Sequence, residues 1–433
     1  MSVLHIQGGR PLSGEAPASG AKNAVLPLMA AALLSDEPTT LLNVPRLRDV
    51  ETMCELLASL GVRTSFAGGR LHINPAGFEG RPVTHDLMSR MRASYYVIPA
   101  LLARRGQAKV GMPGGCAIGA RKIDLHLRAF AALGAEIRED EDAHEITLRL
   151  RSAGGLTGAG MTLIGERGTS VGATCNALMA AVLAGGDTTL EGAAQEPEVA
   201  CLVEMLRSMG AVILGEGSPT LHIRGVRRLH GTEFTVIPDR IEAGTYLLAG
   251  AITRGCVTIT HCRPDHMGAA LEALGQMGVE LRISQSAVTI VRVPPALKPL
   301  NITTRPYPGF PTDLQSPFVA LLTQAEGLSV VRETIFENRF QTGLELRDKM
   351  GANVSVDDEP ALIVQGPTRL RPAVLEAGNL RQGAALVLAA LAADGESEVH
   401  NVHFIQRGYE RLAEKLSALG ASITLKDPVL QPE

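Results

Sequence analysis

The sequence lacks any marked excess of charge of one sign. Its 41 Lys and Arg residues are nearly balanced by 45 Asp and Glu residues, which gives a formal net charge of −4 and a pI near 6.3. Because general nucleic-acid binders present a basic face to the phosphate backbone, we expect no nucleic-acid partner. A local cluster of Lys and Arg could still bind a small anion.

Paired cysteines, long apolar runs and several well-known motifs are also missing. The six cysteines form no CxxC pair and no zinc-like spacing, so we expect a reducing compartment and no metal site. The longest apolar runs, such as residues 384–393, fall far short of the roughly 20 residues that a membrane span needs. The start shows no signal-peptide layout, and no GxxxxGK(S/T), GxGxxG or HExxH motif occurs. We expect a cytoplasmic protein without a membrane segment.

What the sequence does contain is internal repetition. Six times, a predicted helix ends in Leu-Gly or Met-Gly and an alternating strand follows, at a spacing of about 70 residues. Each glycine stands where a helix needs a left-handed C-terminal residue. The six glycines are Gly61, Gly134, Gly210, Gly278, Gly351 and Gly420. Since the chain is too long for one ordinary core, this pattern predicts two α/β domains of three repeats each.

The repeats also predict the domain boundaries. The first domain is expected to span residues 22–229, and the second to combine residues 1–21 with residues 230–433. Residues 4–17 precede the first full repeat, so we expect them to pair with a sheet of the other half. The second domain would then be discontinuous.

One loop, residues 113–121, is longer than its counterparts in the other repeats. Its three glycines let the tip hinge, so Cys116 is expected to be exposed. Arg121, together with a helix predicted to begin near Lys122, favours the thiolate form and attracts anions. From the spacing alone, a reactive thiol and an ordinary surface cysteine are equally good interpretations.

Basic residues recur at the ends of predicted elements. They are Lys22, Arg92, Arg121, Arg339, Arg381 and Arg407. Lys22, Arg92 and Arg381 are expected to open first helices of repeats, where the helix dipole disfavours a cation unless an anion is bound. Arg407 is expected to open the second helix of the last repeat. Each alone is best explained as a solvated surface charge, but together they favour an anion site.

Asp313 stands at a predicted helix start that three prolines precede. A side chain in this position is normally an N-cap. It could instead act as a base if it faces a cleft. The spacing favours the cap.

Eight segments together resemble the UDP-N-acetylglucosamine 1-carboxyvinyltransferases, a family of enolpyruvyl transferases in bacterial cell-wall synthesis. They are residues 19–23, 91–94, 113–121, 170–174, 238–242, 310–315, 336–340 and 407–411. The resemblance runs over nearly the whole chain. The cysteine loop is its most specific part, because the related shikimate-pathway enzymes share the fold but not this loop.

The resemblance implies two inside-out α/β barrel domains of three repeats each, closing over a cleft. It implies transfer of the enolpyruvyl group of phosphoenolpyruvate to the 3-hydroxyl of UDP-N-acetylglucosamine, with release of phosphate. This is the first committed step of peptidoglycan synthesis. No metal and no organic cofactor are implied, and we expect a monomer or weak oligomer. Fosfomycin is expected to modify Cys116.

The resemblance also assigns residues by position. Phosphoenolpyruvate would be held by Lys22, Arg92, Arg121, Arg381 and Arg407. UDP-N-acetylglucosamine would be held by Asn23, Arg92, Arg121, Lys122, Ile123, Asp124, Leu125, Ser170, Val171, Gly172, Asp313 and Ile335. Asp313 would accept the proton of the sugar hydroxyl. Cys116 would act as general acid, form a covalent adduct or help the product leave, with Lys22 and Arg407 completing the catalytic set.

Three positions depart from the family's pattern. Asn379 stands where the family usually has Asp, Gly168 stands where many members have Lys, and Gln406 lies in a segment that differs from its counterparts. These departures leave two alternatives open. One is a paralogous enolpyruvyl transferase with another acceptor, and the other is a non-catalytic regulator that binds UDP-sugars.

Overall fold

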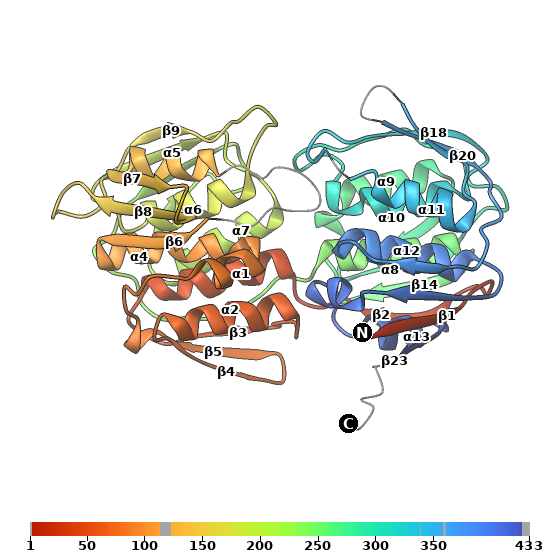
Figure 1. Ribbon diagram of the computed structural model, residues 1–433, viewed down its shortest axis with the longest axis horizontal. Helices are drawn as coiled ribbons and strands as arrows, with labels where there is room; N and C mark the ends of the chain where they lie inside the picture. Colours follow the sequence, from red (N-terminus) through yellow and green to blue (C-terminus); the bar gives the residue numbers. More distant parts are fainter. Residues whose placement is uncertain (1, 113–122, 338, 358–360, 427–433) are drawn as a thin grey trace. The chain divides into compact units, whose positions relative to one another are not determined.

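The computed structural model describes residues 2–112, 123–337, 339–357 and 361–426 (Figure 1). Cys116, Arg121 and Lys122 lie outside the described residues. The chain forms two compact units. The Asp313 unit contains the residues up to Ser19 and those from Pro238 onward, and the Lys22 unit contains the described residues from Gly20 to Ile237.

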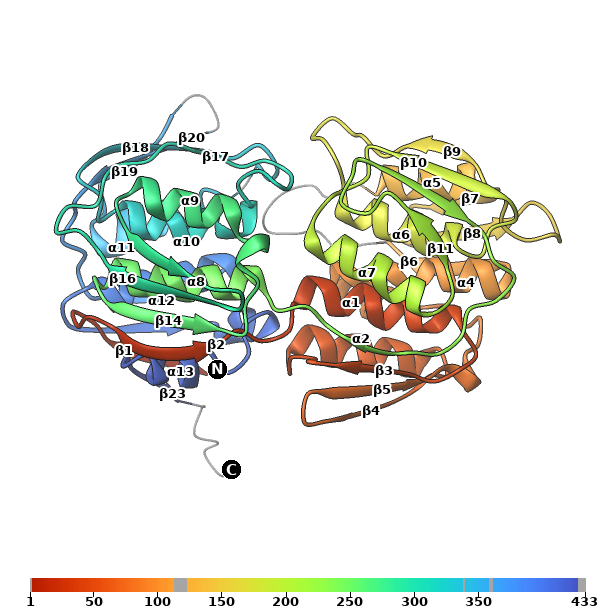
Figure 2. The same ribbon diagram turned by 180° about the vertical axis from the view of Figure 1, so that it is seen from behind.

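Three helices form the core of the Asp313 unit: α8 (Arg240–Ile252), α10 (Thr312–Leu322) and α12 (Leu380–Ala392). Every residue of α8 after Arg240 is buried, as expected for a helix that is apolar on all sides. The helices pack closely, since a Cβ at Gly244 would lie 2.8 Å from Cδ1 of Leu314 on α10. In both views the strands of this unit lie outside these helices (Figures 1 and 2).

Three four-stranded sheets complete the core of the Asp313 unit. In strand order they are β21 (Val374–Glu376), β22 (Glu396–His400), β1 (Val3–Gln7) and β23 (Ser422–Lys426); β15 (Glu280–Ile283), β16 (Ala287–Arg292), β14 (Cys256–Thr260) and β2 (Ser13–Pro17); and β17 (Ile302–Thr303), β18 (Gly327–Arg332), β20 (Ala361–Gly366) and β19 (Val354–Val356). Burial alternates along the strands, so each sheet covers the core with one face. The other helical elements are α9 (Gly268–Gln276), α11 (Gln341–Met350), α13 (Leu412–Ala418) and the 3₁₀ turns Pro264–His266 and Val402–Arg407.

The start of the chain belongs to these sheets. β1 lies between β22 and β23 and is antiparallel to both, with Ile6 opposite Ser397 and Ile423. β2 pairs in parallel with β14. The predicted pairing of residues 4–17 with strands of the later half is therefore present.

The Lys22 unit is built in the same way. Its two most buried helices are α1 (Lys22–Ala31) and α6 (Val171–Ala181), and α4 (Ile98–Arg105) packs against α6. The other helices are α2 (Arg48–Ser59), α3 (His85–Arg90), α5 (Asp124–Ala132) and α7 (Pro197–Ser208), with 3₁₀ turns at Ala32–Leu34, Pro75–Gly77 and Arg92–Val97. Its sheets run β13 (Glu233–Thr235), β3 (Thr39–Leu42), β5 (Arg70–Asn74) and β4 (Arg63–Ala67); β6 (Gln107–Gly111), β8 (Glu145–Leu150) and β7 (Ala135–Asp140); and β11 (Val212–Leu214), β12 (Thr220–Arg224), β10 (Asp187–Glu191) and β9 (Gly160–Thr162).

The six glycines that mark the repeats all adopt the predicted conformation. Their φ angles lie between 77° and 100°, the left-handed region in which a residue with a Cβ is strained. Each follows a helix and precedes one of the strands β4, β7, β11, β15, β19 and β23. The prediction of a helix, a left-handed glycine and a strand is confirmed at all six places.

Two predicted helix starts are wrong. Arg92 opens a 3₁₀ turn, Arg92–Val97, and α4 begins only at Ile98. Arg407 ends the turn Val402–Arg407, and α13 begins at Leu412. The chain turns between Arg407 and the start of α13, because Gly408 packs against Leu380 and Arg411 has a φ of 50°.

Candidate active site

Asp313, in the first turn of α10, is the centre of a charged cluster in the Asp313 unit. One carboxylate oxygen accepts a hydrogen bond from Nη2 of Arg339 at 2.9 Å, and the other accepts one from Nη2 of Arg381 at 2.7 Å. The N-cap of α10 is Pro311, and no side chain caps the helix. The interpretation of Asp313 as an N-cap is therefore wrong, because two guanidinium groups draw its carboxylate away from the helix amides.

The two arginines are deeply buried, whereas the carboxylate between them is not. Each arginine side chain is 4% exposed and that of Asp313 is 24% exposed. Burial by itself lowers the pKa of Arg381, but Asp313, Tyr409 and Asp239 together outweigh burial and raise the pKa above its usual value. Nε of Arg339 and Nη1 of Arg381 have no hydrogen-bond partner within the described part of the chain. Both arginines thus retain donors after pairing with Asp313.

Glu333 fixes the start of α10 to the end of β18. Its buried carboxylate accepts hydrogen bonds from the hydroxyls of Thr304 and Thr312, both at 2.8 Å, and from the amide of Ile335 at 2.8 Å. Thr312 in turn accepts a hydrogen bond from Nη1 of Arg339 at 2.6 Å. This network sets the positions of Asp313 and Ile335 through neighbours that are themselves anchored.

Arg381 also faces an aromatic ring. Its guanidinium carbon lies 5.5 Å from the ring centroid of the buried Tyr409, whose hydroxyl lies 2.9 Å from the hydroxyl of Thr245. Burial raises the pKa of Tyr409, although Arg381 opposes the shift. Arg407, a half-buried residue, precedes Tyr409 by two positions. Asn379, the N-cap of α12, accepts hydrogen bonds from the amides of Arg381 and Gln382, a role that an aspartate could also fill.

A second buried cluster lies where the chain leaves this unit. The Glu242 carboxylate accepts hydrogen bonds from Nζ of Lys415 at 2.8 Å and from the amide of Ser19 at 2.6 Å. Burial raises the pKa of Glu242 to about 7, and Lys415 limits the shift. Ser19 is the last residue before the chain enters the Lys22 unit. The cluster therefore anchors one end of the connection.

The Lys22 unit holds the other predicted contacts. Lys22 is the first residue of α1, and its Nζ lies 3.4 Å from Oδ2 of the buried Asp49. The guanidinium carbon of Arg92 lies 5.7 Å from the ring centroid of Tyr95. Asn23 follows Lys22 in the first turn of α1.

Two further predicted segments begin neighbouring helices. Ile123 is the N-cap of α5, which starts with Asp124 and Leu125. Ser170 is the N-cap of α6, and its hydroxyl accepts a hydrogen bond from the amide of Ala173 at 3.3 Å. Since α5 and α6 pack against each other, the two predicted segments lie in the same part of the unit.

Sequence reasoning therefore named Asp313 and Arg381, which the structure brings into contact. It noted Arg339 only as one of several basic residues and did not identify Thr312, Glu333 or Tyr409 as part of a site. A basic residue in a polar loop was the one signal available for Arg339. Nothing in the sequence marks Glu333, which reads as an ordinary residue after a strand.

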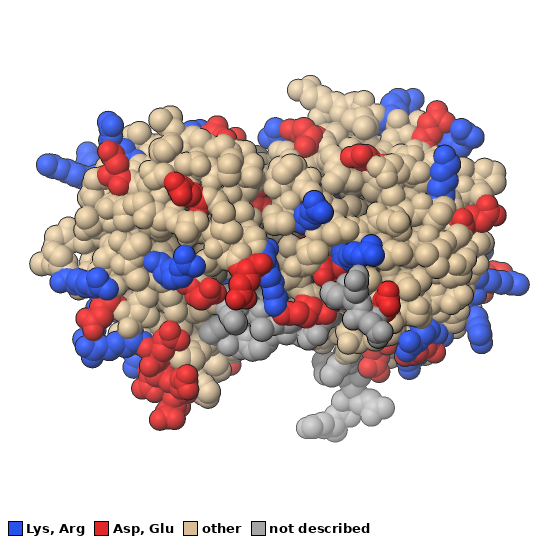
Figure 3. Space-filling model, turned by 90° about the horizontal axis from the view of Figure 1, so that it is seen from above, with Lys and Arg blue, Asp and Glu red and all other residues tan. Residues whose placement is uncertain are grey.

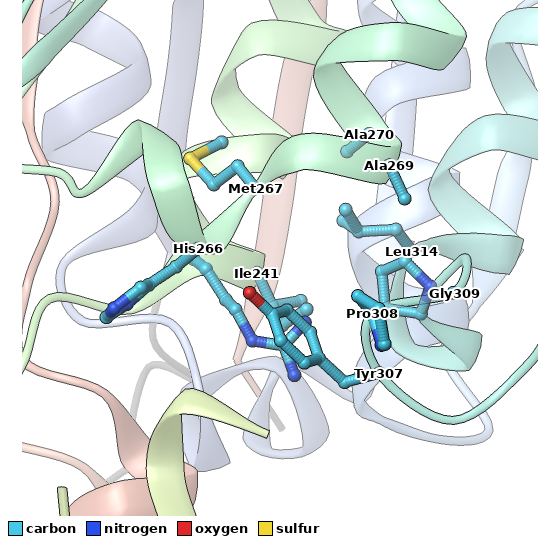
Figure 4. Close-up of a pocket in the computed structure, with 11 residues that line it drawn as sticks. Ile241, His266, Met267, Ala269, Ala270, Tyr307, Pro308, Gly309 and Leu314 are labelled. Carbon is cyan, nitrogen blue, oxygen red and sulfur yellow. The ribbon is translucent and has the colours of Figure 1, made fainter. Parts of the chain in front are cut away.

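The Asp313 unit also has a small hollow on its surface (Figure 4). Its volume is about 270 Å³, which includes open solvent, and its lining contains Arg240, His266 and Tyr307 together with apolar residues such as Met267 and Leu314. The guanidinium carbon of Arg240 lies 5.5 Å from the Tyr307 ring centroid. Neither Asp313 nor Arg381 lines it, although Leu314 adjoins Asp313.

Three further features are the surface charge, the groups that could bind a metal ion and the helices that could span a membrane. On the face drawn in Figure 3, acidic and basic side chains are intermingled, in line with the balanced composition. Within the described residues, no group of three or more His, Cys, Asp or Glu could hold a metal ion. Among the same residues, no helix is long and apolar enough to cross a membrane.

Comparisons with known proteins give consistent matches over nearly the full chain. The family described as EPSP synthase (3-phosphoshikimate 1-carboxyvinyltransferase) matches residues 6–416. The sequence is 44% identical over 423 residues to a UDP-N-acetylglucosamine 1-carboxyvinyltransferase of Halothermothrix orenii, covering 98% of this chain and 99% of the relative. It is 46% identical over 433 residues to the protein of that name in Brucella ovis, with coverages of 98% and 99%.

Solved structures agree with these relatives. The enolpyruvyl transferase NikO from Streptomyces tendae superimposes with a TM-score of 0.87 at 29% identity, covering 98% of this chain and 99% of that chain. EPSP synthase from Acinetobacter baumannii gives a TM-score of 0.74 at 17% identity, with coverages of 99% and 100%. The second likeness concerns the fold alone, an α/β fold with mixed sheets.

Proposed function

The chain belongs to the EPSP synthase family of enolpyruvyl transferases, and from this premise we propose that it transfers the enolpyruvyl group of phosphoenolpyruvate to the 3-hydroxyl of UDP-N-acetylglucosamine. Two relatives of that name, 44% and 46% identical over nearly the full length, support this acceptor. The observation that carries the chemistry is Asp313, a partly exposed carboxylate held by two buried arginines.

The reaction needs a base and an acid. The sugar oxygen bonds to C2 of phosphoenolpyruvate as its proton leaves, and C3 gains a proton. The C2–O bond to phosphate then breaks as C3 loses a proton, which restores the double bond. Asp313 accepts the hydroxyl proton, because Arg339 and Arg381 hold both of its oxygens in fixed directions. Cys116, outside the described residues, is the proposed acid or covalent partner.

Several cations are needed because phosphoenolpyruvate carries up to three negative charges that must leave water. The proposed set is Lys22, Arg92, Arg121, Arg381 and Arg407. The donors left on Arg381 after it pairs with Asp313 support its part in this set. Loop closure over the substrates would keep water from competing with the sugar hydroxyl.

The sugar nucleotide has its own proposed set. It comprises Asn23, Arg92, Arg121, Lys122, Ile123, Asp124, Leu125, Ser170, Val171, Gly172, Asp313 and Ile335. Asp124 and Leu125 at the start of α5, and Ser170 to Gly172 at the start of α6, suit the diphosphate because helix N-termini attract anions.

We also propose the finer organisation. The domains expected at residues 22–229 and at residues 1–21 plus 230–433 correspond to the two units, which divide at Ser19/Gly20 and at Ile237/Pro238. Each is an inside-out α/β barrel of three repeats. Three sheets in each unit and the six left-handed glycines support this proposal. The activity is placed at the first committed step of peptidoglycan synthesis, in the cytoplasm, in a monomer or weak oligomer without a cofactor.

The test is release of phosphate from phosphoenolpyruvate with and without UDP-N-acetylglucosamine. We expect release only with the sugar, and Asp313→Asn should lower kcat by about 100-fold or more, since a positioned base contributes about 100- to 10,000-fold. The matched control is Asp348→Asn, which breaks an exposed pair with Arg347 in the same unit and should leave kcat unchanged. Release that does not depend on the sugar would rule the proposal out.

A paralogue with a different acceptor is the second candidate. The likeness to NikO, an enolpyruvyl transferase in the words of its own description, and the presence of Asn379 favour it. A panel of UDP-sugars and shikimate-type acceptors separates the two candidates. If UDP-N-acetylglucosamine is the one good acceptor, the paralogue is excluded. Binding of the sugar without turnover would instead indicate a regulator.

A further inference from the structure

The two proposed nucleotide-binding segments of the Lys22 unit are joined by a side chain that neither segment includes. His126, in the first turn of α5, directs its ring toward the start of α6. A Cβ at Gly172 would lie only 2.7 Å from Nε2 of this ring. Because real Cβ atoms do not approach other atoms so closely, the ring packs directly against the Gly172 backbone, and a side chain at this position would displace the ring.

The first turn of α6 is held from other directions as well. Nδ2 of the buried Asn176 donates a hydrogen bond to the carbonyl oxygen of Gly172 at 2.9 Å. The Ser170 hydroxyl accepts from the amide of Ala173. The amides of Val171 and Gly172 have no acceptor within the helix, as is general for the first residues of a helix. Both amides can therefore donate to an anion, in a turn that His126 and Asn176 fix from two sides.

The His126 ring is held in place by packing and is uncharged near neutral pH. Burial and the positive charge of Arg92 lower its pKa to about 4, while Asp124 opposes the shift. Its Nδ1 is buried without a hydrogen-bond partner among the described residues. The ring of Tyr95 lies 6.5 Å away between centroids, at an interplanar angle of 51°. A charged ring would place a second cation beside Arg92, at the positive end of α6.

We propose that His126 is a positioning residue for the sugar nucleotide: by packing against Gly172 it sets the spacing between the start of α5 and the start of α6. The inference rests on the proposed function, which assigns both segments to the UDP-sugar. Removing the ring would let the two segments approach or separate, so that Asp124–Leu125 and Ser170–Gly172 no longer fit one diphosphate-linked ligand together.

The test is calorimetric titration of the full-length protein with UDP-N-acetylglucosamine, without phosphoenolpyruvate, beside steady-state kinetics. His126→Ala should weaken binding by about tenfold or more and raise KM for the sugar nucleotide more than it lowers kcat. Gly172→Ala should act in the same direction by displacing the ring. His126→Gln, which keeps a polar side chain of similar reach, should recover most of the affinity. His222→Leu, at an exposed histidine of β12, is the control.

The pH dependence gives an independent readout. Between pH 5.5 and pH 8 the wild-type affinity should stay constant, because burial and Arg92 hold the pKa of His126 at about 4, below this window, burial raises the pKa of Tyr95 further above the window, and the diphosphate diester does not titrate. A tenfold loss of affinity on acidification to pH 5.5 would overturn the account of an uncharged ring.

The possible results distinguish a failure of the proposed function from a failure of the positioning role of His126. If the wild-type protein does not bind UDP-N-acetylglucosamine, the proposed function fails. If it binds and His126→Ala binds equally well, the positioning role is wrong. An equal fall in kcat for every variant, with KM unchanged, also contradicts it. If His126→Ala does not fold, the affinities of His126→Gln and Gly172→Ala are compared instead. Weaker binding by Gly172→Ala than by His126→Gln supports the positioning role, and equal affinities contradict it.

Discussion

Two carboxylates of the Asp313 unit are held in contrasting ways. Asp313 is partly exposed and lies between two guanidinium groups, so its ionised form is stabilised where substrate could reach it. Glu242 is fully enclosed beside Lys415, Ser19 and Tyr246, and burial raises its pKa to about 7. Asp313 is therefore suited to act as a base, whereas the protonation of Glu242 makes the stability of the folded protein depend on pH.

Glu242 predicts how stability changes with pH. Its folded-state pKa of about 7 lies above the ordinary value of 4.5, so between these values the folded protein binds more protons than the unfolded chain. Stability should therefore fall as pH rises through this window. Urea unfolding from pH 5 to pH 8 should show this fall in the wild-type protein and a flatter dependence in Glu242→Gln.

The control for this prediction is Glu414→Gln, which breaks an exposed pair with Arg411. It should keep the wild-type pH dependence, while Glu242→Gln is also less stable overall because Lys415 is left buried without its partner. Equal slopes for the wild-type protein and Glu242→Gln would show that Glu242 does not titrate in this range.

At the scale of residues, contacts between side chains that are far apart in the sequence could not be predicted from local sequence patterns. Asp313 and Arg381 were assigned to one site by resemblance, and they are hydrogen-bonded across 68 positions. Arg339 and Glu333 act on the same cluster through the fold of β18 and α10. Local patterns carry no information about such pairs, because neither residue has a distinctive neighbourhood in the sequence.

At the scale of elements, the helix-to-strand transitions were predictable because a left-handed residue is a local requirement that glycine meets. All six glycines confirm it. The starts at Arg92 and Arg407 were not predictable, since tertiary packing of Gly408 and the 3₁₀ geometry near Arg92 decide them. Local conformational demands can be read from a sequence, whereas turns imposed by packing cannot.

Gly134 gives a quantitative test of this element. Its φ is 99° and nothing lies within 4 Å of an added Cβ, so Gly134→Ala introduces backbone strain alone. The cost should be about 1–2 kcal/mol in the free energy of unfolding. The control Gly275→Ala, inside α9 with equally open space, should stabilise the protein by up to about 1 kcal/mol. Opposite signs in urea unfolding are expected, and a destabilising effect at both sites would contradict the argument.

At the scale of the whole molecule, the Asp313 unit depends on both ends of the chain. Ile6 on β1 is fully buried between β22 and β23, so Ile6→Ala should cost about 2–4 kcal/mol. Hydrogen exchange should show lost protection in β22, β23 and α12, with α1 and α6 unchanged. The exposed neighbour Gln7 is the control, since Gln7→Ala should leave exchange as it is. Equal loss in both units would show that the effect of Ile6→Ala is not confined to the Asp313 unit.

The placement of β1 also governs the order of events on the ribosome. A nascent chain grows by about 5–20 residues per second, and residues 20–237 are complete long before β22 and β23 leave the exit tunnel. β1 must therefore remain without its hydrogen-bonding partners until residues 396–400 and 422–426 have been synthesised. The unpaired backbone N–H and C=O groups of β1 could pair with another chain during this time, so a chaperone that covers them would reduce aggregation.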